Sequence, residues 1–116
     1  MPTISITSSG NISEEEALAE LAGAGFHGIA EDGVGQVEEL HWHDFDAVVY
    51  VMSGEASAEL ADGTIITAGA GTTVRVPRGT VHKDVPGQTY RRVLGFSIPP
   101  SEMTQPIDRP VDLLPA

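Results

Sequence analysis

The chain of 116 residues contains no cysteine, few aromatic residues and few basic side chains. Without cysteine it can form neither a disulfide framework nor a thiolate metal site, so any bound metal must use imidazole, carboxylate or water ligands. Six Lys and Arg residues stand against 17 Asp and Glu residues, for a formal net charge of -11. A chain this acidic repels nucleic-acid phosphates and anionic membrane surfaces, which argues against both as partners.

The sequence also lacks a hydrophobic run long enough to cross a membrane. Its first ten residues lack the basic and apolar segments of a signal peptide, so we expect a cytoplasmic protein. A length of 116 residues predicts one domain with a modest core. The apolar fraction of 41% is close to that of globular proteins and gives no sign of wholesale disorder.

Residues 1–33 predict a strand and a helix that pack on the rest of the domain. The strand is expected at residues 3–7, where apolar and polar residues alternate. Ser13 followed three residues later by Glu16 is typical of a capping box, which opens a helix. Gly23 lies where the apolar helical pattern stops, and we expect the helix to end there.

Residues 34–98 change to short β-prone runs separated by turn residues. The expected strands are 36–43, 47–53, 55–61, 64–68, 72–77, 81–85 and 89–98. Asp62 and Gly63 between two such runs predict a tight hairpin, and Ser53 and Gly54 predict a further break. Regular short strands with turns between them favour an all-β sandwich or barrel.

Residues 99–116 form a third segment, because five of the eight prolines lie in it. Proline removes a backbone donor, which excludes a long helix or a central strand here. Val111, Leu113 and Leu114 offer apolar contacts. We therefore expect an arm docked on the barrel or lying across the partner in a homodimer.

The histidines are the residues best suited to chemistry. His41 and His43 are two positions apart, so on a strand they face the same side. His82 follows on a later predicted strand and can complete one side of a metal's coordination sphere. Imidazole nitrogens in a site without thiolates suit a divalent transition metal, namely Fe, Mn, Ni, Zn or Cu. His27 lies in a glycine-flanked segment, and we expect it in a surface loop without a role.

These histidines belong to a pattern that resembles the first motif of the cupin superfamily, G-x5-H-x-H-x3,4-E-x6-G. Gly35, His41, His43 and Gly54 fall on its glycines and histidines. The second cupin motif, G-x5-P-x-G-x2-H-x3-N, follows in order. It is matched by Gly71, Pro77, Gly79 and His82.

The resemblance covers roughly residues 35 to 98. It implies an all-β double-stranded β-helix barrel, here with a short N-terminal helix and a proline-rich C-terminal arm. It also implies that His41, His43 and His82 are metal ligands and that the chain forms a homodimer, as small cupins commonly do.

The chain departs from the family pattern where the carboxylate ligand belongs. The motif glutamate falls on Ala47, which cannot bind a metal, and the final asparagine falls on Pro86. Asp46 is one residue out of register and would need a bulge to turn inward. Glu39 shares strand parity with His41 and is a candidate ligand, imidazole-orienting group or general base. Asp46 and Glu39 are therefore the candidate catalytic residues.

The last predicted strand places Tyr90, Arg92, Leu94 and Phe96 on one face and Arg91 on the other. An arginine that faces the barrel interior can hold a substrate carboxylate, but the sequence does not decide which arginine does so.

Three functions remain open at this point, because the cupin fold supports many activities. One is a metal-dependent oxygenase, isomerase, lyase or decarboxylase that acts on a small organic acid or carbonyl compound. The second is a non-catalytic domain that binds a small ligand such as a sugar. The third is a metal-free structural barrel.

Overall fold

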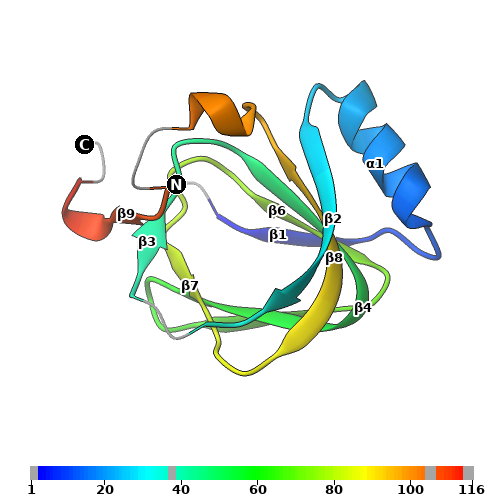
Figure 1. The fold of residues 1–116 in the computed structure, drawn as a ribbon. Coiled ribbons are helices and arrows are strands. Elements are labelled where there is room, and N and C mark those ends of the chain that lie inside the picture. Colours follow the sequence, from blue (N-terminus) through cyan, green and yellow to red (C-terminus); the bar gives the residue numbers. More distant parts are fainter. Residues whose placement is uncertain (1–2, 37–38, 104–106, 114–116) are drawn as a thin grey trace.

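The computed structural model describes residues 3–36, 39–103 and 107–113 and shows a β-rich domain with one α-helix (Figure 1). The elements in chain order are β1 (Ser5–Ser8), α1 (Glu14–Gly23), β2 (His27–Val34), β3 (His41–Trp42), β4 (Ala47–Leu60), β5 (Ile65–Gly69), β6 (Thr72–Val76), β7 (His82–Asp84), β8 (Thr89–Phe96) and β9 (Arg109–Pro110). Short 3-10 helices cover Pro100–Glu102 and Val111–Leu113. No helix within these described ranges is long and apolar enough to cross a bilayer.

The strands form two sheets that share the long strand β4. The first half of β4 pairs with β6 and β8, which extend to β1 and β2 respectively. The second half pairs with β5 and β7, and β7 continues to β3 and β9. All these pairings are antiparallel, and the strands curve around a central space, which confirms the predicted cupin-like β architecture (Figure 1).

The predicted break at Ser53 and Gly54 is wrong, because both residues lie within strand β4. The chain does not turn there: β4 runs without interruption, with a register shift between Val51 and Ser53 against β8. Gly54 takes a φ of +76°, which glycine adopts at little cost. A bulge bends the strand without ending it, so one strand serves both sheets. The hairpin predicted at Asp62 and Gly63 is confirmed between β4 and β5.

Strand β2 was not expected from the sequence. Its residues pair with β8 from His27 opposite Phe96 to Val34 opposite Thr89. The glycines in this segment weaken the local strand signal, but pairing with β8 overrides that preference. His27 is exposed, as expected, although it opens a strand and does not lie in a loop.

The apolar core lies between α1 and the outer face of the first sheet. The capping box is confirmed, since Ser13 Oγ accepts from Glu16 N at 3.1 Å and Ser13 N donates to Glu16 Oε1 at 3.2 Å. The core cluster consists of Ala17, Leu21, Val48, Tyr50 and Val93. Because side chains alternate along β4, packing these residues outward against α1 turns Ala47 and Val49 to the opposite face, where they line a cavity.

Within the described part of the predicted strand 36–43, only the two residues of β3 are in a strand; residues 37–38 lie outside the described residues. Gly35 explains part of this, because it pairs with the loop after β7: its N donates to Gln88 O at 2.8 Å, and Gly87 N donates to Gly35 O at 3.1 Å. The approach is close, since a Cβ on Gly35 would lie 2.0 Å from Val85 O. The first glycine of the motif is thus required by backbone packing.

Replacing Gly35 by alanine is therefore expected to lower the free energy of unfolding by more than about 2 kcal/mol, because the backbone of the 85–87 loop must move. Chemical denaturation measures the change. Gly69→Ala is the matched control: its added Cβ would meet nothing within 4 Å, so a change below about 1 kcal/mol is expected. Equal losses in the two variants would contradict this account.

Candidate metal centre

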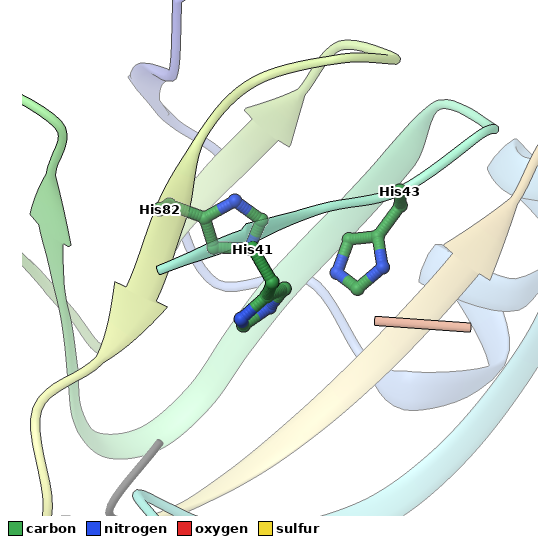
Figure 2. Close-up of side chains that lie close together, drawn as sticks. All are labelled: His41, His43 and His82. Atoms are coloured by element: carbon green, nitrogen blue, oxygen red, sulfur yellow. The ribbon is translucent and has the colours of Figure 1, made fainter. Parts of the chain in front are cut away.

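Three imidazoles converge from two strands at one side of the cavity. His41 on β3 lies opposite His82 on β7 in the antiparallel register, and His43 follows β3 directly. One ligand atom from each of the three rings lies within 4.8 Å of the others. Figure 2 shows the three rings gathered around a common space, with His82 reaching it from β7. The structure thus brings together the three histidines selected from the sequence.

Each ring is oriented by a backbone carbonyl. The Nδ1 atoms contact Glu39 O (3.0 Å, His41), Ile107 O (3.1 Å, His43) and Thr80 O (2.8 Å, His82). A carbonyl oxygen can only accept a hydrogen bond, so each Nδ1 carries the proton. In a neutral ring the Nε2 atom then keeps its lone pair for a metal, and such carbonyl contacts are typical of metal-binding histidines.

His82 is buried deeply enough to change its titration. Burial lowers the pKa of its imidazole to about 4, and this effect outweighs the opposing hydrogen bond to Thr80 O. The neighbouring His41 and His43 lower the pKa further, whereas the carboxylate of Asp108 raises it. His82 is therefore neutral at pH 7, the state in which an imidazole can bind a metal.

The cavity beside the histidines has a volume of about 340 Å³ and a mostly apolar wall. Ala47, Val49, Phe45 and Phe96 are among the residues that line it. The polar groups in the wall, besides the histidines, are Ser57, Asp84, Gln88, Tyr90, Arg92 and Asp108. A cavity of this size and character suits a small organic molecule with one or two polar groups.

The structure identifies Arg92 as the arginine that reaches the cavity. Its Nε donates to Glu31 Oε2 at 2.9 Å, and its Nη1 donates to Tyr90 Oη at 2.9 Å. Burial is the largest single effect and disfavours the charged guanidinium, but the hydrogen bonds and charge interactions with Glu31 and Tyr90 together outweigh it and raise the pKa of Arg92. Arg91 faces the other side, where it pairs with Glu14 and Asp32.

Neither candidate carboxylate from the sequence lines the cavity. Asp46 is exposed, and its Oδ1 accepts a hydrogen bond from Arg78 N at 2.7 Å. This bond joins the loop before β4 to the loop after β6. The Asp46 backbone N also donates to Ser97 Oγ at 2.9 Å. Glu39 is exposed, and its backbone carbonyl, not its carboxylate, contacts His41.

The carboxylate that does reach the histidines is Asp108, which the sequence did not suggest. Its Oδ1 lies 3.8 Å from His41 Nε2 and 3.5 Å from His43 Nδ1. It comes from the C-terminal arm, which docks on β3 of its own chain through β9. Val111 is exposed, and Leu114 lies outside the described residues.

The comparisons with known proteins agree with this architecture. The sequence profile of the Cupin domain family matches residues 28–84. No curated protein matches the chain. A solved structure of a Neisseria meningitidis protein is 25% identical, with a TM-score of 0.53, over 62% of this chain and 73% of that one.

Two further solved structures share the fold. A DUF861 family protein of Thermotoga maritima is 17% identical, with a TM-score of 0.55, over 79% of this chain and 97% of its own. The polyketide cyclase RemF of Streptomyces resistomycificus is 23% identical, with a TM-score of 0.50, over 84% of this chain and 67% of its own. With both sequence motifs in order, the matching profile and this fold, the chain belongs to the cupin superfamily.

Proposed function

We propose that this cupin is a metal-dependent enzyme that acts on a small organic acid or carbonyl compound. The observation that carries the proposal is the set of three imidazoles, each held by a backbone carbonyl, in the wall of a cavity of about 340 Å³. Three protein ligands leave coordination positions open, which is the arrangement of a catalytic site rather than a structural one. A divalent transition ion such as Fe, Mn, Ni, Zn or Cu fits this donor set.

An ion bound there would supply Lewis-acid chemistry at a carbonyl or carboxylate oxygen of the substrate. The chain's own residues would bind and orient the rest of the molecule. Among the described lysine and arginine residues, Arg92 lines the cavity, and its guanidinium can bind a substrate carboxylate. Tyr90 Oη accepts a hydrogen bond from Arg92, so its own hydrogen is available to a substrate oxygen. The aromatic rings of Phe45 and Phe96 pack edge to face in the cavity wall and would offer an apolar surface to the substrate.

The test compares metal-loaded and metal-stripped protein against a panel of small keto acids, hydroxy acids and diketones. Product is detected by mass spectrometry, and oxygen consumption is followed in parallel. We expect turnover of at least one compound only when the ion is present. Absence of bound ion in the wild-type protein would leave a metal-free barrel. A bound ion with ligand binding but no turnover would favour a non-catalytic binding domain.

Arg92→Met tests the substrate class. Loss of a charged hydrogen-bond donor is expected to raise the KM or Kd for a carboxylate compound about tenfold or more, while the KM for an uncharged carbonyl compound changes little. Arg91→Met is the matched control, because Arg91 pairs with Glu14 outside the cavity. Equal effects of the two substitutions would exclude Arg92 as the carboxylate-binding residue.

A further inference from the structure

Asp108 lies beside the three-histidine site. It lines the same cavity as His41, His43 and His82. Its Oδ1 lies 3.8 Å from His41 Nε2 and 3.5 Å from His43 Nδ1, so the carboxylate is next to two of the three rings.

Asp108 places a carboxylate oxygen 3.8 Å from the Nε2 atom of His41. A divalent ion bound by the imidazoles would gain an anionic ligand from such an oxygen, beside three donors that carry no negative charge.

The His43 ring is oriented by the backbone of the arm. His43 Nδ1 contacts Ile107 O at 3.1 Å, whereas the Asp108 carboxylate oxygen at 3.5 Å is beyond the usual range for a hydrogen bond. The arm thus positions both the ring and the neighbouring carboxylate at the cavity.

The arm is anchored on the C-terminal side of Asp108 as well. Trp42 Nε1 donates to Pro110 O at 3.0 Å, and the Arg109 guanidinium lies 5.5 Å from the centre of the Trp42 ring. β3 pairs with β9 in the register Trp42 opposite Arg109. Asp108 thus stands between two attachment points on the strand that carries the histidines.

We propose that Asp108 supplies the carboxylate ligand of the metal site, taking the part that a side chain on β4 cannot take at Ala47. Ala47 lines the cavity with only a methyl group. Asp108 reaches the ion from the C-terminal arm, a different element of the fold. This inference rests on the proposed function, because it requires that the three histidines hold an ion. An ion that prefers octahedral coordination would still keep positions open to a substrate beside four protein ligands.

The experiment measures the affinity of metal-stripped protein for Mn²⁺ and Zn²⁺ by calorimetry. Asp108→Asn keeps the size of the side chain and removes its charge, and Asp112→Asn is the matched control on an exposed residue of the same arm. We expect Asp108→Asn to weaken Mn²⁺ binding roughly 10- to 100-fold, with a smaller loss for Zn²⁺, because carboxylates suit the harder ion and imidazoles suit zinc. Asp112→Asn is expected to match wild type.

A crystal structure of the Zn²⁺-loaded wild type gives a second, independent reading. We expect a carboxylate oxygen of Asp108 at about 2.0–2.2 Å from the ion. Unchanged Mn²⁺ affinity in Asp108→Asn, or an ion bound by the histidines with Asp108 turned away, would overturn this inference and leave the proposed function standing. A wild-type protein that binds neither ion would overturn both.

Discussion

Replacing His82 by alanine is expected to lower the affinity for a divalent ion by about 100-fold or more. His82 is 7% exposed and faces His41 across the β3–β7 pair, so no other described side chain can take its position without moving the strands. A structural zinc site with four ligands is worth about 10–16 kcal/mol, which gives about 3 kcal/mol for one ligand. That amount corresponds to about a hundredfold change in affinity.

Calorimetry or competition with a chelator measures this affinity in the metal-stripped protein. His27→Ala is the matched control, since His27 is an exposed histidine at the start of β2 and does not belong to the cluster. We expect its ion affinity to equal that of wild type. If His82→Ala and His27→Ala bind the ion equally well, the convergence of the three rings has no bearing on metal binding.

The fold and the histidine cluster could be predicted because local patterns and the two cupin motifs agree. Glycines and a proline at motif spacing set the turns, and alternation along a strand places His41 and His43 on one side. The antiparallel pairing that follows from these turns brings His82 opposite His41. Strand parity thus groups His41 with His43, whereas the joining of His82 was expected from the resemblance to the cupin motifs.

Asp108 could not be predicted because nothing local connects it to the site. It lies 65 positions after His43 in a proline-rich segment, and only the docking of β9 on β3 brings it to the rings. The same reason explains Arg92. Strand parity separated Arg92 from Arg91, but only the packing of α1 on the outer face decides which of the two faces points inward.

Strand β4 was misread as two strands for a related reason. A glycine after a serine is typical of a turn, and the sequence alone does not distinguish a turn from a bulge with a left-handed glycine. The surrounding strands decide. β8 pairs with β4 on both sides of the register shift between Val51 and Ser53, so the bent strand continues into the second sheet.

The metal-stripped protein is expected to lose stability as the pH falls from about 6.5 to about 4, because of His82. In the unfolded chain this imidazole takes up a proton near its ordinary pKa of about 6.5. In the folded protein, burial lowers the pKa to about 4. Between these values the unfolded state binds more protons, so the free energy of unfolding rises with pH and falls on acidification. The contribution of this one group is up to about 3 kcal/mol.

Denaturation in guanidinium chloride at pH values from 7 to 4 measures this effect in wild type and in His82→Gln, which cannot take up the proton. The carboxylates and the other histidines titrate in both proteins, so the difference between the two pH profiles isolates His82. We expect wild type to lose up to about 3 kcal/mol more than His82→Gln over this range, and His27→Ala to follow wild type. Parallel profiles for wild type and His82→Gln would mean that the ring is protonated in the fold as readily as in the unfolded chain. A ring so readily protonated would compete poorly for a metal ion at mildly acidic pH, whereas a ring kept neutral by burial remains available to the ion.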